Sequence, residues 1–466
     1  MLFSGIPFLY YFLPLVIFIY FLAPKALKNS VLLIFSLAFY AWGEPKYVFL
    51  MIATIGVNYI LGLLIEKFRN TPLSRLFMLL SAVFSLGVLG YFKYADFFIE
   101  NFNAVTGLSV KMLNIALPIG ISFYTFQILS YTVDVYRGNV RAQRNPITLG
   151  AYISLFPQLI AGPIVRYSDV EKQLIARTHS FDKISLGIRR FILGLSKKII
   201  LANTLGELCD TFHTTGDKSV LFYWLFAIAY MLQIYFDFSG YSDMAIGLGK
   251  IFGFDFCENF RYPFISGSIS EFWRRWHISL GSWFRDYVYI PMGGNRVGKL
   301  RLLINIFTVW FLTGFWHGAE WNFIIWGLYF GVLLLLEKYF LSKFIEKQKI
   351  LRHIYVLFFI AISFVIFSAT GMKDALGLIG GLFGGGGIPV LSAAAIYSLR
   401  SYAVVLLIGI LAATPLFVKI KERLDMNKKI QTALDILEPV YLLMLLILST
   451  AYLADGSFNP FLYFRF

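Results

Sequence analysis

Long apolar runs alternate with short polar gaps along almost the whole chain. The clear runs are residues 7–23, 47–65, 76–92, 147–165, 185–203, 219–236, 302–316, 321–341, 353–369, 399–418 and 433–453, and the weaker ones are 30–43, 114–132 and 243–254. A helix that crosses the hydrocarbon core needs about 20 predominantly apolar residues. The pattern predicts an all-α, polytopic integral membrane protein with roughly 11–13 membrane helices, some of them re-entrant. We expect residues 1–466 to form a single transmembrane domain.

Two of the expected helices contain residues that interrupt a regular helix. Pro118 and Gly120 open one, and Pro157, Gly162 and Pro163 interrupt another. Proline removes a backbone donor and clashes with the preceding turn. Inside a membrane such a break is tolerated only within protein or beside a water-filled cavity. The breaks therefore indicate either a cavity or simple kinks in packed helices, and the sequence leaves both open.

Composition agrees with a membrane protein and argues against a soluble one. Hydrophobic residues make up 58% of the chain and charged residues 14%, whereas a soluble domain averages about 25% charged residues. Neither Cys209 nor Cys257 belongs to a C-x-x-C pair, so neither a disulfide framework nor a thiolate zinc site is expected. Residues 1–11 carry no charge, so we expect the run 7–23 to be a retained first span rather than a cleaved signal.

Basic residues occupy the gaps between apolar runs and give the chain a net charge of +15. This placement fits the positive-inside rule and argues against nucleic-acid binding. The clusters expected in the cytoplasm are Lys25 with Lys28, Lys67 with Arg69 and Arg75, Arg137 with Arg141 and Arg144, Lys343 with Lys347, Lys349 and Arg352, and the group at 419–429. The same orientation places the N-terminus and the turn at 317–320 outside.

Polar side chains at membrane depth are costly and are candidates for function. The first such cluster follows the run 219–236 and contains Asp237, Ser239, Tyr241 and Asp243. It is interpreted either as the polar lining of a substrate route or as a bend between two helices whose carboxylates cap the second helix.

The second cluster lies at 271–287, where Arg274, Arg275 and His277 stand among tryptophans. Such a group is typical of an interfacial anchor. The alternative is that His277 faces a polar cavity beside these charges. Residue type alone does not decide between the two.

The third cluster lies at 313–321 and contains Trp316 and His317, with Gly314 and Gly318 on either side. Histidine can take and give a proton near neutral pH, and a neighbouring base activates a hydroxyl nucleophile. The glycines allow a substrate or another helix to approach closely. The alternative is a histidine at the membrane interface that only caps a helix.

The other histidines, His179, His213 and His353, are interpreted as solvated. A zinc site would need several ligands at matching spacing, and the sequence contains no such set, so no metal is expected.

These motifs closely resemble those of the membrane-bound O-acyltransferase family, and most of all its bacterial alginate O-acetyltransferase branch. The matching stretches are 156–169 (FPQLIAGPIVRYSD), 233–264 (QIYFDFSGYSDMAIGLGKIFGFDFCENFRYPF), 271–296 (EFWRRWHISLGSWFRDYVYIPMGGNR), 314–321 (GFWHGAEW) and 458–466 (FNPFLYFRF). A lone W-H-G would be weak, but ordered blocks along nearly the whole chain are specific.

The resemblance implies helices packed around a central funnel or tunnel in the bacterial inner membrane. It implies that His317 is the catalytic histidine and His277 the second residue the branch relies on. Asp237, Ser239, Tyr241, Asp243, Arg274 and Trp316 are then expected to contact substrate. It further implies acetyl-CoA as the acyl donor, an exported polysaccharide as the acceptor, and a secreted or membrane-anchored partner protein that receives the acyl group.

Two alternatives stay open at this point. One is D-alanyl transfer to teichoic acid, since those enzymes share the W-H-x-S-L and F-W-H-G elements. The run 289–296 (YIPMGGNR) favours the alginate-type branch instead. The other is a carrier of acyl groups or lipids without chemistry of its own, for which inverted repeats would be typical.

Overall fold

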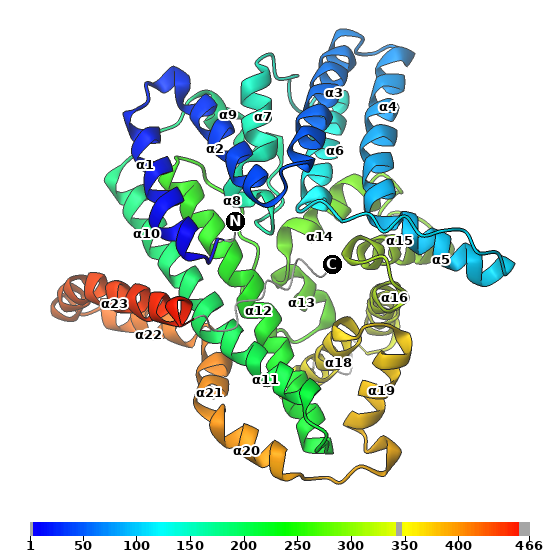
Figure 1. Cartoon of the computed structure of the whole chain (residues 1–466), viewed down its shortest axis with the longest axis vertical. Helices are drawn as coiled ribbons and strands as arrows, with labels where there is room; N and C mark the ends of the chain where they lie inside the picture. The colour runs from blue at the N-terminus through cyan, green and yellow to red at the C-terminus, as the bar shows by residue number, and fades with distance from the viewer. Residues whose placement is uncertain (1–2, 342–346, 456–466) are drawn as a thin grey trace. The chain divides into compact units, whose positions relative to one another are not determined.

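The structure, a computed structural model, describes residues 3–341 and 347–455 (Figure 1). Within these residues the regular elements are all helical, and none is a β-strand. The predicted all-α class is therefore confirmed. The tail 458–466, which contributed to the family resemblance, and Lys343 of a predicted cytoplasmic cluster lie outside the described residues.

The chain forms two compact units. Unit 1 comprises Met1–Phe191 and Ser242–Cys257, and unit 2 comprises Ile192–Tyr241 and Glu258–Phe466. The boundary between them falls within two helices, α10 (Phe181–Ser196) and α12 (Val220–Ile251). The expectation of a single transmembrane domain stays a prediction.

Unit 1 contains short and long helices, and buried polar side chains form hydrogen bonds between neighbouring helices. Its helices are α1 (Leu13–Leu22), α2 (Lys28–Gly43), α3 (Tyr47–Lys67), α4 (Pro72–Leu89), α5 (Ala95–Thr106), α6 (Ile121–Arg137), α7 (Pro146–Ser154), α8 (Phe156–Leu159), α9 (Tyr167–Ile175) and the first part of α10. Helices α3, α4 and α6 lie side by side (Figure 1). The hydroxyl of Ser81 donates to Asn58 Oδ1 at 2.6 Å, and it lies 3.1 Å from Thr132 Oγ1. Such bonds hold apolar helices together where the hydrophobic effect between them is weak.

The expected interruptions in unit 1 are present, and the backbone explains them. Helix α6 begins at Ile121, later than the predicted run, because Gly120 adopts φ +74°. A Cβ at Gly120 would lie 2.7 Å from the carbonyl oxygen of Leu159. The run 147–165 divides into α7 and α8, and a Cβ at Gly162 would lie 2.5 Å from Gln158 Cα. Both glycines therefore permit close approach of backbone segments.

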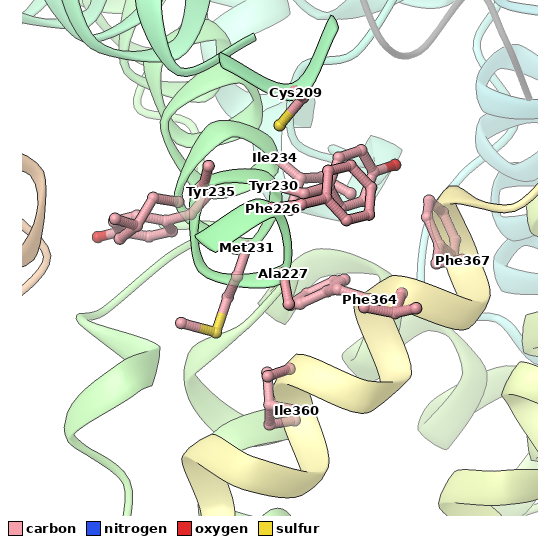
Figure 2. Close-up of a cluster of buried hydrophobic side chains, with 14 of the residues drawn as sticks. Cys209, Phe226, Ala227, Tyr230, Met231, Ile234, Tyr235, Ile360, Phe364 and Phe367 are labelled. Carbon is pink, nitrogen blue, oxygen red and sulfur yellow. The ribbon is translucent and has the colours of Figure 1, made fainter. Parts of the chain in front are cut away.

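Unit 2 is built around the first part of α12. Its other helices are α11 (Asn203–Thr214), α13 (Ile269–Arg275), α14 (Ile278–Phe284), α15 (Lys299–His317), α16 (Trp321–Leu336), α18 (Leu351–Ser368), α19 (Met372–Leu382), α20 (Ala393–Ser401), α21 (Ala403–Ala412), α22 (Leu416–Asp425) and α23 (Lys428–Ala454). Figure 2 shows part of its core, where Phe226 and Tyr230 of α12 belong to one buried cluster with Phe364 and Phe367 of α18.

Many of these helices suit a bilayer. Among the described residues, eight helical stretches are long and apolar enough to cross a membrane, or nine if the pair α20–α21, bent by 59°, is one broken span. They are Lys25–Gly43, Tyr47–Lys67, Pro72–Thr106, Val220–Ile251, Lys299–His317, Trp321–Leu341, Leu351–Ser368 and Lys428–Ala454. Other predicted membrane segments, such as 7–23, are shorter helices in the structure. The chain is a multi-pass membrane protein.

Candidate functional site

His317 is the last residue of α15, which ends there because Gly318 adopts an extended backbone. Its side chain is buried, with 7% of its surface exposed. Three aromatic rings surround it, with centroids 5.0 Å (Trp316), 5.1 Å (Trp326) and 5.4 Å (Phe367) from the imidazole. The histidine is therefore held in an apolar enclosure and does not simply cap a helix in water.

The glycines around His317 bring α15 and α16 into close contact. A Cβ at Gly314 would lie 2.3 Å from the carbonyl oxygen of Phe323, and one at Gly327 would lie 2.2 Å from that of Trp310. At Gly318 a Cβ would meet the ring of Phe323 at 2.1 Å. The sequence left open whether a substrate or another helix lies against these glycines. In the structure the neighbouring helix α16 lies against them.

His277 is the N-cap residue of α14, in a left-handed conformation with φ +44°. Its Nδ1 accepts a hydrogen bond from the Leu280 N–H at 3.4 Å. The ring centroid lies 4.6 Å from Phe238 of α12 and 6.1 Å from Trp316. In the sequence His277 lies between the spanning helices α12 and α15, and its side chain is buried.

The structure thus brings together three of the predicted site residues. The indole of Trp316 lies close to both histidines, with ring centroids 5.0 Å from His317 and 6.1 Å from His277. The rings of Phe238, Phe260 and Trp316 lie next to His277, and the alternative in which it faces a polar cavity stays open.

Arg274 contributes to a different feature, a cavity of about 600 Å³ in unit 2. Charged and hydroxyl side chains from α13 and from the end of α16 line it, among them Ser268, Ser270, Arg274, Glu337 and Lys338. The cavity combines cations with hydrogen-bonding groups. Its volume lies within the usual range for small-molecule sites, about 300–1,000 Å³.

Glu337 fixes the start of the helix that carries Arg274. Its carboxylate accepts the N–H groups of Ile269 and Ser270, and also the Ser270 hydroxyl at 3.0 Å. The Ser268 hydroxyl accepts the Glu271 N–H at 3.0 Å and caps the same helix. Negative charge and acceptors at a helix N-terminus are stabilising. Glu337 thereby also constrains α13, which leads directly to His277.

Of the two interpretations of the cluster at 237–243, the bend between two helices is wrong, because α12 runs without interruption from Val220 to Ile251. The run 243–254 is accordingly part of this helix rather than a separate segment. The carboxylate of Asp237 does not cap a helix. It forms an ion pair of 2.7 Å with Lys198, both side chains being only 3% exposed.

Lys198 comes from the π-helical turn Lys197–Ala202 that continues α10. Its ammonium group also donates to Asn203 Oδ1 at 2.9 Å. A Cβ at Gly240 would lie 2.7 Å from the carbonyl oxygen of Gly194, so the two helices approach closely here. The two buried charges therefore compensate each other at this contact between α10 and α12.

The remaining predicted residues divide between the units. Ser239 and Tyr241 are buried in unit 2, each with 3% exposure. Asp243 lies in unit 1, where Arg190 binds its carboxylate at 2.8 Å. The substrate-binding roles of all these residues stay predictions.

A buried hydrogen-bond donor next to His317 was missed by the sequence analysis. The Nε1 of Trp326, in α16, is buried and makes no hydrogen bond to any described residue. An unsatisfied buried donor is unfavourable by about 1–3 kcal/mol. Its only sequence signal was a second tryptophan in the helix that follows the W-H-G motif, five residues after Trp321.

Lys198 was also missed, although a signal for it existed. Lys198 lies in the run 185–203, and a charged side chain within such a run is costly at membrane depth unless it has a partner. His179, which the sequence placed among the solvated histidines, is half-buried, and its Nε2 lies 3.1 Å from the Tyr20 hydroxyl. Among the described residues, no three His, Cys, Asp or Glu side chains come together as metal ligands would.

Comparison with known proteins agrees with this arrangement. The model of the membrane-bound O-acyltransferase family matches residues 139–376, which include both histidines. The chain is 40% identical to a protein named probable alginate O-acetylase from Azotobacter vinelandii, with 100% of both chains covered. It is 36% identical to a peptidoglycan O-acetyltransferase from Helicobacter pylori, covering 83% of this chain and 81% of that protein. A teichoic acid D-alanyltransferase from Bacillus subtilis is 31% identical, covering 55% and 69%.

Proposed function

Because the chain belongs to the membrane-bound O-acyltransferase family, we propose that it transfers an acetyl group from a cytoplasmic donor to an exported cell-surface polysaccharide. It is a multi-pass acyltransferase of the bacterial inner membrane. The observation that carries the proposal is the enclosed arrangement of His317, Trp316 and His277 within the segment that matches the family.

His317 is the proposed general base. A polymer hydroxyl is a weak nucleophile until a base takes its proton, and a positioned general base contributes typically about 10²–10⁴-fold to rate. The aromatic enclosure excludes water and holds the imidazole in one place. Trp326 Nε1, beside it, is the proposed donor to the oxygen that becomes negative during acyl transfer. His277 supports the site from its place close to Trp316.

Acetyl-CoA is the proposed donor, as a thioester that supplies the acetyl group. The cavity beside α13 fits one end of such a molecule, because Arg274 and Lys338 can bind phosphate oxygens and the serine hydroxyls can bind amides. The cluster at 347–352 follows Lys338 and is expected in the cytoplasm. The cavity is thus at the expected donor side, whereas the turn after His317 is expected at the acceptor side.

Acetyl transfer is favoured over D-alanyl transfer by the extent of similarity. The two O-acetylating relatives match 83% or more of the chain, and the D-alanyltransferase matches 55%. We further propose that a secreted or membrane-anchored partner protein receives the acetyl group and passes it to the polymer. The site at the outer end of α15 supports a step that is completed outside.

Substitution of His317 tests the proposed function. We expect His317→Ala to remove nearly all acetylation of the exported polysaccharide, and His317→Gln to fail as well because an amide cannot take the proton. The matched control is His213→Ala, whose ring packs on Phe226 at 4.9 Å between centroids. Acetyl content is measured by mass spectrometry of the polymer, with membrane abundance checked by immunoblot.

An active His317 variant would contradict the base assignment. If either substitution at normal abundance leaves near wild-type acetylation, a carrier without chemistry of its own becomes the better explanation. If His317→Ala lowers the amount of protein in the membrane, the test uses His317→Gln at normal abundance, and its acetylation relative to the wild type decides the question.

A further inference from the structure

Three basic side chains gather around the ring of Tyr20 in unit 1. The Nζ of Lys28 lies 4.3 Å from the centroid of this ring, and the Cζ of Arg177 lies 5.8 Å from it. His179 Nε2 lies 3.1 Å from the Tyr20 hydroxyl oxygen. That hydroxyl donates its single hydrogen to the carbonyl of Phe252 at 2.8 Å, so His179 is the donor to the tyrosine oxygen. We call Lys28, Arg177 and His179 the Tyr20 cluster.

The Tyr20 cluster concentrates positive charge. The nearby carboxylate of Asp255 is bound to Lys183 at 3.1 Å and to Lys250 at 3.2 Å. Arg177 stacks on the ring of Phe254 at 4.6 Å, and its Nη1 is buried without a hydrogen bond to any described residue. Burial lowers the pKa of His179, and the charges of Lys28 and Arg177 lower it further. Cations held together in this way favour an anion among them.

The position of the Tyr20 cluster suits a lipid. Lys28 begins α2, directly after the first apolar helix, at the end of unit 1 expected in the cytoplasm. Asn29 ties this end to the segment before Arg177 by donating to the carbonyl of Leu174 at 2.9 Å. Leu22, at the end of α1, and Ile175, at the end of α9, are 69% and 78% exposed. Apolar side chains beside cations match a headgroup joined to acyl chains.

We propose that the Tyr20 cluster binds a phosphate group, with Arg177 and Lys28 contacting its oxygens and His179 donating to them once it is protonated. The exposed side chains of Leu22 and Ile175 favour an anionic phospholipid of the cytoplasmic leaflet as the molecule that carries this phosphate. A soluble phosphate compound carries the same chemistry and is distinguished by the experiment. The site is separate from the proposed acyl-transfer function and does not depend on it.

The lipid arm measures phosphatidylglycerol retained by the purified full-length protein in native mass spectrometry. We compare Arg177→Gln with Arg144→Gln, which breaks an exposed ion pair to Glu66, and Lys28→Gln with Lys67→Gln, which removes a lysine over the ring of Phe68. Each pair loses the same charge from the same unit. A basic residue near an anionic membrane surface contributes about fivefold to affinity. We expect that loss for Arg177→Gln and Lys28→Gln, and little change for the controls.

The soluble arm adds inorganic pyrophosphate to delipidated protein and follows the thermal unfolding temperature. A rise in the wild type that Arg177→Gln abolishes would assign the site to a soluble phosphate. Arg177→Lys, which keeps the charge, should retain most of the binding in whichever arm responds, and it separates lost charge from failed folding. Equal losses in all four glutamine variants would indicate general surface attraction and overturn the proposal. No response of the wild type in either arm would overturn it as well.

Discussion

At the scale of single residues, the site depends on individual side-chain groups, each of which can be removed by one substitution. Trp326 contributes an indole N–H beside His317, at 5.1 Å between the rings. Trp326→Phe keeps an aromatic ring and removes the donor. We expect acetyl transfer to fall by about 10²-fold, the usual effect of removing one donor to a developing oxyanion. The measurement is the initial rate of polymer acetylation in membranes with equal amounts of each variant.

Trp224 provides the control for this substitution. Its Nε1 donates to the carbonyl of Leu382 at 3.0 Å, so Trp224→Phe removes a structural hydrogen bond. We expect a small loss of thermal stability and an unchanged rate per folded molecule. Full activity of Trp326→Phe would show that the indole N–H does not contact the reacting group.

The buried ion pair of Lys198 with Asp237 gives a second prediction at this scale. Asp237→Asn leaves the Lys198 ammonium buried without its counter-charge, and breaking such a pair costs about 3–5 kcal/mol. We expect a marked loss of folded protein. The double variant Lys198→Met, Asp237→Leu should recover most of it, because no charge is then buried alone. Membrane abundance and the thermal unfolding temperature in detergent are the measurements.

The activity of that double variant decides the role of Asp237. If the carboxylate only holds α12 against the end of α10, the refolded double variant acetylates normally. If it also contacts substrate, as the sequence predicted, the double variant folds and is inactive. A double variant no more stable than Asp237→Asn would contradict the ion-pair explanation.

At the scale of elements, His317 is positioned by the close contact of α15 with α16. Gly314→Ala places a Cβ 2.3 Å from the Phe323 carbonyl oxygen, where only movement of the backbone can relieve the clash. Overpacking of this kind costs about 1–3 kcal/mol. We expect a lower unfolding temperature and, because the end of α15 shifts, lower acetylation per folded molecule.

Gly377→Ala in α19 is the matched control, since no atom lies within 4 Å of its Cβ position. A glycine replaced by alanine in a helix with open space usually gains stability slightly. Equal unfolding temperatures and equal acetylation in Gly314→Ala and Gly377→Ala would show that the close contact of α15 with α16 does not position His317.

At the scale of the whole molecule, the structure supports part of the predicted topology. Arg69 donates to the Val135 carbonyl at 3.1 Å, and Arg144 pairs with Glu66. The basic loops at 67–75 and 137–144 therefore meet at one end of unit 1, as loops on the same side of a membrane must. The sequence alone placed both in the cytoplasm.

Cysteine labelling tests the orientation. In a variant whose two cysteines, Cys209 and Cys257, are replaced, single cysteines are introduced at Arg69, Arg141 and Ala319. We expect an impermeant maleimide to label position 319 in intact cells, and positions 69 and 141 only after permeabilisation. Labelling of 69 and 141 from outside would reverse the orientation and, with it, the assignment of donor and acceptor sides.

The sequence by itself determined the class of the protein and its most informative residues. Apolar runs of bilayer length predicted a helical membrane protein because water is absent from the hydrocarbon core and the backbone must bond to itself. The W-H-G and W-R-R-W-H motifs pointed to His317 and His277 through their resemblance to a family. The interruptions at Gly120 and Gly162 were also predictable, since proline and glycine mark breaks locally.

Only the tertiary structure decided which residues meet. Nothing along the chain indicated that Asp237 pairs with Lys198, and a bend stayed open as an interpretation at a place where α12 is continuous. The sequence did not connect His179 to Tyr20, or Trp326 to His317. The order of apolar and polar residues along the chain reflects the helical period and the surrounding bilayer, because both act on residues that are close in sequence. The partner of a buried charge or ring depends on how helices that are distant in sequence pack together. A buried charge or hydrogen-bond donor without a partner is costly, but the sequence around it does not indicate which residue the partner is.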